Sequence, residues 1–272
     1  MDPRPIGVFD SGVGGLTVLK ELVKVLPAED FIYLGDTARY PYGSQSREVV
    51  ARLAREITSY LVECGVKAVV VACNTATASA MPQLAQEFAV PVMGVIDAGV
   101  KRAVAASRIG AIGVIGTYVT MASGAYQQAL WRSGAKQVWA RACPLFVPLV
   151  EEGLVSGEMA RLAVAHHLGQ REPVDALILG CTHYPLLKGA IGEFLGPQVT
   201  LIDSAESVAA LAPEELRLDP APRREGRVQL QVTGEDRQFR AMLDLIGGIG
   251  GPVERVRIER LQEAYARRAR QG

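Results

Sequence analysis

Two cysteines stand out because each ends an apolar run and is followed at once by polar residues. Cys73 follows the run Val66–Ala72, and Cys181 follows the run Val174–Gly180. A thiol at the start of a helix meets unpaired N–H groups and partial positive charge, which lower its pKa toward neutrality. A single cysteine of this kind is more often a small buried hydrophobe, but two at equivalent positions favour function. The pattern therefore predicts a pair of functional thiols.

His183 and Asp10 are the ionisable side chains best placed to act beside these thiols. His183 lies two residues past Cys181, where it could tune that thiol or relay its proton, and the alternative is an ordinary surface histidine. Asp10 follows the first apolar run and could bind a substrate ammonium or assist a thiol, or it could only cap a helix. Neutral hydrogen-bond donors suited to a carboxylate adjoin the thiols: Asn74, Thr75 and Thr182.

Metal and cofactor chemistry is not indicated by the remaining motifs. The two other histidines, His166 and His167, are adjacent in a helical stretch, so no zinc site is predicted. The turn Gly12–Gly15 lacks the spacing of either nucleotide-binding glycine motif. None of the six lysines follows a strand end where it could hold pyridoxal phosphate. We therefore expect no metal and no cofactor.

The elements that must position these residues alternate between short apolar runs and helical patterns. Strands are predicted at Ile6–Phe9, Phe31–Leu34, Val66–Ala72 and Val90–Ile96. Helices are predicted after a turn within Gly12–Leu26, and at Arg47–Glu63 and Thr75–Phe88. This rhythm predicts an α/β fold with a parallel sheet and helices on both faces. Ligands bind at the carboxyl ends of such strands, which is where the polar residues above are expected.

Three segments of the first half recur in the second half at nearly constant offsets. They pair Ile6–Ser11 with Ile112–Thr117 (offset 106), Val66–Cys73 with Val174–Cys181 (offset 108), and Val95–Asp97 with Leu201–Asp203 (offset 106). Any α/β protein has apolar strands at similar spacing, but here Cys73 and Cys181 close equivalent strands. We therefore predict two structurally similar halves.

The C-terminal part has a different texture. Ala212–Gly226 is rich in proline and charge and is predicted to be a surface linker. The segments predicted after it are a strand over Arg227–Thr233, a helix over Asp236–Ile246, a glycine turn over Gly247–Gly251 and a charged, solvated helix over Arg257–Arg270. We expect this tail to return to the first half, which gives one domain of residues 1–97 plus 210–272 and a second domain of residues 98–209.

Composition limits the function classes. The 272 residues carry 29 basic and 29 acidic side chains, and zero net charge argues against a nucleic-acid or anionic-membrane surface. A hydrophobic fraction of 49% predicts a globular core. No signal peptide or membrane-spanning run is seen, so we expect a cytoplasmic protein with reduced thiols, in which Cys64 and Cys143 are structural.

Five segments together resemble the glutamate racemase family, within the aspartate/glutamate racemase superfamily. They are IGVFDSGVGGLTVLKEL (Ile6–Leu22), GDTARYPYG (Gly35–Gly43), VVACNTATA (Val70–Ala78), PLFVPLVEEG (Pro144–Gly153) and LGCTHYPLL (Leu179–Leu187). The resemblance implies two pseudo-symmetric parallel-sheet α/β domains with the active site in the cleft between them. It also implies interconversion of L- and D-glutamate without a cofactor.

The resemblance also assigns roles to residues. Cys73 matches the cysteine that deprotonates D-glutamate, and Cys181 matches the one that deprotonates L-glutamate. Asp10 and His183 match the residues that assist the first and the second thiol. Substrate-contacting positions are matched by Ser11, Tyr42, Gly43, Asn74, Thr75, Thr117 and Thr182, together with Asp10 and His183. Asp36 and Glu151 match acidic residues near the site.

Biological context follows from the same resemblance. D-Glutamate is a building block of peptidoglycan, which implies a bacterial enzyme of cell-wall synthesis, and homodimers are common in the family. Some members inhibit DNA gyrase as a side activity, but zero net charge gives this no support here. The chain begins at the first strand, without the extension of members regulated by a cell-wall precursor, so we do not expect that regulation.

A thiol pair suits racemisation, because one proton must leave one face of Cα and another must arrive on the opposite face. Two bases on opposite sides achieve this without moving the substrate, and their titrations are coupled. Three alternatives stay open on the sequence alone. They are a racemase for aspartate or another small acid, a catalytically idle amino-acid-binding or regulatory protein, and a thiol-redox protein.

Overall fold

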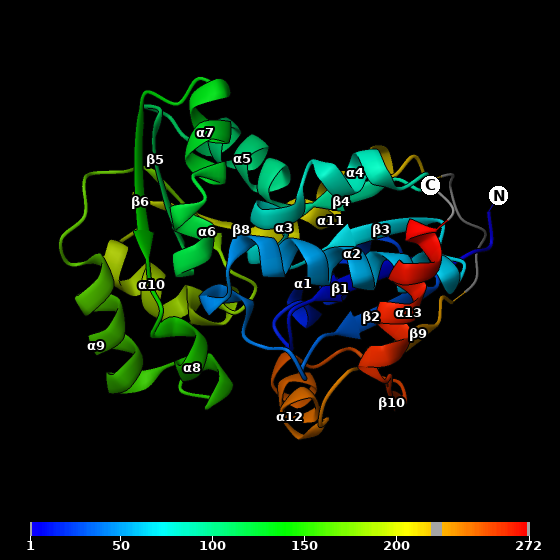
Figure 1. Ribbon diagram of the computed structural model, residues 1–272. Helices are drawn as coiled ribbons and strands as arrows, with labels where there is room; N and C mark the ends of the chain where they lie inside the picture. Colours follow the sequence, from blue (N-terminus) through cyan, green and yellow to red (C-terminus); the bar gives the residue numbers. More distant parts are fainter. Residues whose placement is uncertain (1, 219–224, 271–272) are drawn as a thin grey trace.

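Two separate parallel β-sheets form the framework of the chain, which the computed structural model describes over residues 2–218 and 225–270. The first sheet has the strand order β10-β9-β2-β1-β3-β4, and the second has the order β6-β5-β7-β8. All neighbouring strands run parallel. Figure 1 shows the two halves next to each other, with helices around each sheet. The predicted α/β class with two parallel-sheet halves is confirmed.

In the first half, both faces of the β-sheet are covered by helices and buried. Its strands are β1 (Ile6–Asp10), β2 (Phe31–Gly35), β3 (Ala68–Val71), β4 (Val92–Gly94), β9 (Val228–Val232) and β10 (Val253–Arg255). Its helices are α1 (Leu16–Val25), α2 (Arg47–Glu63), α3 (Asn74–Ala80), α4 (Gln83–Glu87), α12 (Arg237–Ile246) and α13 (Ile258–Ala269), with a short 3₁₀ helix η1 (Tyr42–Ser44). Val8 packs in one core with α1, whereas its neighbour Phe9 packs in the other core with α2. This alternation explains the continuous apolar strands.

The second half repeats this plan on four strands. They are β5 (Ala111–Gly116), β6 (Gln137–Ala142), β7 (Ala176–Gly180) and β8 (Thr200–Asp203). The helices are α5 (Val95–Ala106), α6 (Tyr118–Ala122), α7 (Ala125–Arg132), α8 (Phe146–Glu151), α9 (Gly157–Leu168), α10 (Lys188–Leu195) and α11 (Ser204–Glu215), with a 3₁₀ helix η2 (Tyr184–Leu187). Helix α11 packs against both α5 and α1, so it joins the two halves.

The strand register confirms two of the three predicted repeats. Ile6 of β1 pairs with Ala68 of β3, and Ile112 of β5 pairs with Ala176 of β7. These residues are related by the offsets that the sequence pattern gives, so β1 corresponds to β5 and β3 corresponds to β7. Each of the two cysteines therefore follows the same strand in its own half.

The third predicted repeat is wrong in register. Gly94 pairs with Val71, and Asp203 pairs with Leu179, which makes Gly94 the counterpart of Asp203. Asp97, which the pattern aligns with Asp203, lies inside α5 instead. The predicted strand Val90–Ile96 is correspondingly too long, because the chain turns into α5 at Val95.

The predicted helix Thr75–Phe88 is two helices. It breaks between α3 and α4 at Met81 and Pro82. Pro82 lacks the N–H that a continuous helix needs and disfavours helical backbone at the preceding residue. Met81 accordingly has extended dihedral angles.

The tail returns to the first sheet as expected. Strand β9 pairs with β2, and β10 pairs with β9, so the tail extends that sheet. Helix α13 packs on α2 through the buried Leu261 and Ala264. Gly247 and Gly248 have positive φ in the predicted glycine turn. The predicted linker is wrong at its start, because Ala212 to Glu215 belong to α11 and Ala212 is buried there; residues 219–224 lie outside the described residues.

The domain boundaries stay a prediction. Position 97 falls within α5 and position 209 within α11, and these two helices pack on each other. Over the part of the chain that the structure describes, no helix combines the length and the apolar character needed to cross a bilayer.

Candidate active site

A cavity of about 440 Å³ lies between the two halves, at the carboxyl ends of their central strands. Ser11 enters it from the end of β1, and Thr117 enters it from the end of β5. The segments after β3 and β7 supply Cys73–Thr75 and Cys181–His183. A cavity of this size suits a small ligand. The symmetry of the fold thus brings both thiols to one cavity, as the sequence predicts.

Cys73 is the N-cap residue of α3. Its Sγ accepts a hydrogen bond from the Ala76 N–H at 3.4 Å and lies 3.6 Å from the Ser11 hydroxyl. The side chain is 5% exposed. Burial and the nearby charge of Asp10 raise the pKa of the thiol to about 12, although hydrogen bonds to Ala76 and Ser11 oppose this shift. The predicted lowering of this pKa is therefore wrong for the unliganded site, since desolvation outweighs the helix terminus.

Asp10 lies behind the cavity wall, fully buried at the end of β1. Its Oδ2 accepts the N–H groups of Gly12 and Gly15, each at 3.1 Å, so the carboxylate does fix the loop that leads into α1. Its Oδ1 has no hydrogen-bond partner among the described residues. Burial raises the pKa of Asp10, while the positive charge of His183 and the two N–H donors act against that rise.

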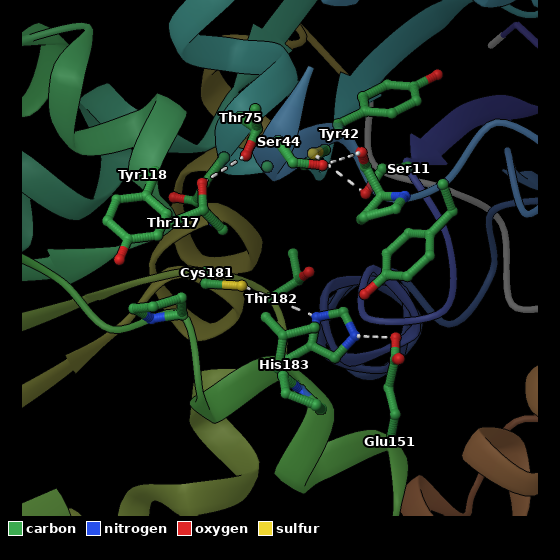
Figure 2. A pocket seen from close by; sticks show the side chains of 18 residues that line it. Ser11, Tyr42, Ser44, Thr75, Thr117, Tyr118, Glu151, Cys181, Thr182 and His183 are labelled. Carbon is green, nitrogen blue, oxygen red and sulfur yellow. Dashed lines mark hydrogen bonds and ion pairs between the residues drawn. The ribbon is translucent and has the colours of Figure 1, made fainter. Parts of the chain in front are cut away.

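Cys181, His183 and Glu151 form a line of hydrogen bonds (Figure 2). The Nδ1 atom of His183 lies 3.8 Å from Cys181 Sγ, and its Nε2 atom lies 3.2 Å from Glu151 Oε1. His183 is 3% exposed, so the alternative of a surface histidine is wrong. Burial alone would lower the pKa of His183, but the hydrogen bonds to Cys181 and Glu151 and the charge of Asp10 raise it to about 10.

Glu151 comes from α8, far from His183 in sequence. Burial alone would raise the pKa of Glu151, but the hydrogen bonds from His183 and Tyr40 and the charge of His183 together lower it. A carboxylate against a histidinium is the usual way to hold an imidazole in one orientation and in its charged form. At neutral pH the Cys181 sulfur therefore has a cation beside it, whereas Cys73 has the carboxyl group of Asp10.

Hydroxyl and amide groups bridge the two halves along one wall of the cavity. Thr75 from the first half lies 3.0 Å from the Thr117 hydroxyl and 3.1 Å from the Thr120 hydroxyl of the second half. The Tyr126 hydroxyl donates to Asn74 Oδ1 at 2.7 Å. The Asn74 Nδ2 atom is buried without a partner among the described residues, so it is free to donate to a ligand.

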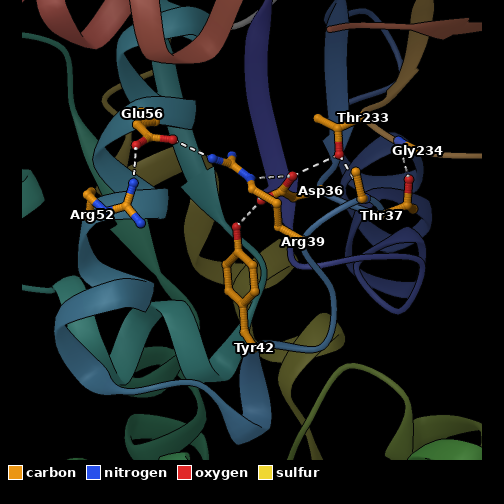
Figure 3. Close-up of polar contacts among 9 residues, drawn as sticks. Asp36, Thr37, Arg39, Tyr42, Arg52, Glu56, Thr233 and Gly234 are labelled. Carbon is orange, nitrogen blue, oxygen red and sulfur yellow. Dashed lines mark hydrogen bonds and ion pairs between the residues drawn. The ribbon is translucent and has the colours of Figure 1, made fainter. Parts of the chain in front are cut away.

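Asp36 does not line the cavity. It is fully buried at the end of β2, and its carboxylate binds the Arg39 guanidinium (Nε–Oδ2 2.8 Å), the Tyr42 hydroxyl and the Thr233 hydroxyl (Figure 3). Arg39 continues to Glu56 of α2. Because both of its oxygens accept hydrogen bonds from protein groups, the Asp36 carboxylate fixes the positions of Arg39, Tyr42 and Thr233.

Most predicted site residues meet at the cavity. Those that line it are Ser11, Tyr42, Gly43, Cys73, Asn74, Thr75, Thr117, Glu151, Cys181, Thr182 and His183. Asp10 and Asp36 are behind it. Sequence reasoning missed further lining residues: Tyr40, Pro41, Ser44, Tyr118, Pro144, Val147 and Pro148. Their positions were an available signal, because Tyr40 and Pro41 lie within the TARYPYG segment, Ser44 directly follows it, and Tyr118 directly follows Thr117. In the described ranges, no group of three or more His, Cys, Asp or Glu side chains is arranged to hold a metal ion.

Fold and site together define an enzyme with two similar α/β halves that enclose a small cavity. A family model described as Asp/Glu/Hydantoin racemase matches residues 6–212. A glutamate racemase of Geobacter metallireducens is 55% identical over 217 residues, which are 79% of this chain and 80% of that protein. The chain belongs to the Asp/Glu/Hydantoin racemase family and is an amino-acid racemase, an isomerase.

Solved structures agree with this assignment. The crystal structure of glutamate racemase from Thermus thermophilus in complex with β-chloro-D-alanine has a TM-score of 0.86 and 49% identity, and the match covers 96% of this chain and 100% of that chain. The structure of glutamate racemase from Francisella tularensis in complex with D-glutamate has a TM-score of 0.86 and 36% identity, and covers 95% of this chain and 99% of that chain.

Proposed function

We propose that this chain interconverts L- and D-glutamate by a two-base mechanism in which Cys73 and Cys181 exchange protons with Cα from opposite faces. One observation carries the proposal: two buried thiols that close equivalent strands of two similar halves line the same cavity. The family and the relatives reported above, which include a structure with D-glutamate, support glutamate as the substrate.

The two thiols must differ in protonation for each turnover. With L-glutamate, the Cys181 thiolate takes the Cα proton and the Cys73 thiol gives a proton to the opposite face, and with D-glutamate the roles reverse. His183, whose pKa of about 10 keeps it protonated at neutral pH, stabilises negative charge on Cys181 from 3.8 Å. Cys73, with its pKa raised to about 12, is held as the protonated partner. In either direction of the reaction the pair carries one proton between its two sulfurs.

The carbanion formed at Cα needs hydrogen-bond donors where negative charge develops on the carboxylate. Asn74 Nδ2 is buried and without a partner among the described residues, and the hydroxyls of Thr75 and Thr182 line the same cavity. We assign carboxylate binding to these three residues, with Ser11, Tyr42, Gly43 and Thr117 as further substrate contacts. Asp10, with one unpartnered carboxylate oxygen, assists Cys73 as His183 assists Cys181. Glu151 acts through His183.

The cellular role belongs to the same proposal. D-Glutamate made by this chain would supply peptidoglycan synthesis in the bacterial cytoplasm, and growth rescue of a D-glutamate auxotroph by the gene tests this. A homodimer, which sedimentation tests, stays a prediction.

The deciding assay follows optical activity of L-glutamate, then of D-glutamate, in D₂O without added pyridoxal phosphate. The proposal expects ellipticity to vanish from either side. It also expects deuterium in the product enantiomer well before the substrate pool exchanges, because the acid that reprotonates Cα is not the base that deprotonated it. Racemisation of aspartate but not glutamate would transfer the proposal to another substrate. Absence of both reactions would favour a binding protein.

A further inference from the structure

The segment Asp36–Ser44, here called the substrate loop, forms one wall of the cavity but is held from outside it. Its second part, from Tyr40 to Ser44, lines the cavity. Its first part meets the end of β9, which comes from the C-terminal tail nearly two hundred positions later in the chain. This contact lies beyond residue 212, where the match to the family model ends.

Thr233 makes two hydrogen bonds to the substrate loop through one oxygen atom (Figure 3). Its hydroxyl donates to Asp36 Oδ1 at 2.8 Å and accepts the N–H of Ala38 at 3.0 Å. The next residue, Gly234, donates its N–H to Thr37 Oγ1 at 2.8 Å. Thr233 is 3% exposed, so its hydrogen bonds are shielded from water, which therefore competes poorly with them.

Asp36 connects Thr233 to Tyr42, which lines the cavity. One carboxylate oxygen accepts from Thr233, and the other accepts from the hydroxyl of Tyr42. Arg39, which lies between Asp36 and Tyr42 in the sequence, binds the same carboxylate and also hydrogen-bonds Glu56 of α2. Because Thr233 and Tyr42 bind the two oxygens of one buried carboxylate, we expect a shift of Asp36 after loss of the Thr233 hydroxyl to loosen Tyr42 as well.

The backbones approach so closely here that a side chain would not fit. A Cβ atom on Gly234 would lie 2.9 Å from the Ala38 nitrogen and 2.9 Å from Thr37 Oγ1. Glycine at this position therefore lets the tail reach the loop.

We propose that Thr233 is a positioning residue that fixes the substrate loop through Asp36, so that the tail sets the affinity of the site for its amino-acid substrate. The proposal rests on the proposed racemase function for its kinetic readout. Strand β9, which Thr233 follows, is separated from β3 by β2 and β1, and Thr233 does not line the cavity that holds both thiols. We therefore expect the proton-transfer step itself not to depend on it.

Thr233→Val tests the proposal because valine keeps the shape but loses both hydrogen bonds. We expect KM for glutamate to rise about tenfold, as for the loss of about one net hydrogen bond to a charged group, with kcat within about twofold. Thr233→Ser keeps the hydroxyl and should restore KM. Thr58→Val is the matched control, since Thr58 is also buried in the first half but donates only to Ala54 O in its own helix, at 2.7 Å.

Hydrogen exchange gives a readout that does not depend on activity. Amides of the substrate loop, above all that of Ala38, should exchange faster in Thr233→Val than in wild type or Thr58→Val. If Thr233→Val does not fold, Thr233→Ala removes the same two hydrogen bonds and serves the same comparison. Unchanged loop exchange together with an unchanged KM would overturn the proposal. A chain that racemises no glutamate would refute the proposed function, while the exchange data would still decide the role of Thr233.

Discussion

Gly14 of the first half lies directly against His183 of the second half. A Cβ atom at Gly14 would sit 2.5 Å from His183 Nδ1 and 2.3 Å from Thr182 Oγ1. The nearby Thr17 hydroxyl donates to the Thr182 carbonyl at 3.0 Å, which ties the two segments together. The glycine turn after β1 therefore sets how closely the two halves meet at the Cys181 side of the cavity.

Gly14→Ala should displace the loop that carries Cys181 and His183. Because a misplacement near 1 Å can cost about a hundredfold in rate, we expect kcat/KM to fall by roughly two orders of magnitude. Overpacking should also reduce the free energy of unfolding by about 1–3 kcal/mol. Gly189→Ala is the control, since a Cβ there meets no atom within 4 Å. Wild-type kinetics in Gly14→Ala would show that the close contact is not needed.

Removal of either thiol should abolish racemisation but leave a diagnostic half-reaction. Cys73→Ala keeps Cys181, so it should still exchange the α-proton of L-glutamate with solvent, and Cys181→Ala should do so only with D-glutamate. Racemisation should fall by about three orders of magnitude, as for the loss of a general acid or base. NMR in D₂O measures exchange and polarimetry measures racemisation. Cys64→Ala, away from the cavity lining, should behave as wild type.

Glu151→Gln should move the alkaline limb of the pH–rate profile to lower pH. The Glu151 carboxylate is one of the groups that raise the pKa of His183 to about 10. Without that charge the imidazolium loses its proton at lower pH, and with it the cation beside Cys181. We expect the limb in kcat/KM for L-glutamate to shift down by about one unit. Glu152→Gln, at the exposed neighbouring position, should leave the limb unchanged. An unshifted limb in Glu151→Gln would assign it to another group.

The strand ends were the predictable part of this site. Apolar periodicity places Cys73 and Cys181 after equivalent strands, and parallel topology then brings them to the same cavity. The third repeat failed because β4 is only three residues long, and Val95 and Ile96 are as apolar in a buried helix start as in a strand. Short apolar runs do not distinguish these two states.

Contacts between distant segments were beyond a single sequence. Glu151 meets His183 only because α8 folds over the cavity, and Thr233 meets Asp36 only because β9 joins β2. Position relative to a strand end also does not fix side-chain direction, which is why Asp10 and Asp36 lie behind the wall and not in it. The pKa of Cys73 was predicted in the wrong direction because sequence shows the helix start but not the extent of burial.

The unequal partners of the two thiols have a thermodynamic consequence. L- and D-glutamate have the same free energy in water, so the equilibrium constant between them is one whatever the catalyst does. A carboxyl group beside Cys73 and a histidinium beside Cys181 can therefore make kcat differ between the two directions only if KM differs by the same factor. An enantiomer that this site turns over faster would therefore also have a proportionally higher KM, while kcat/KM stays identical for both.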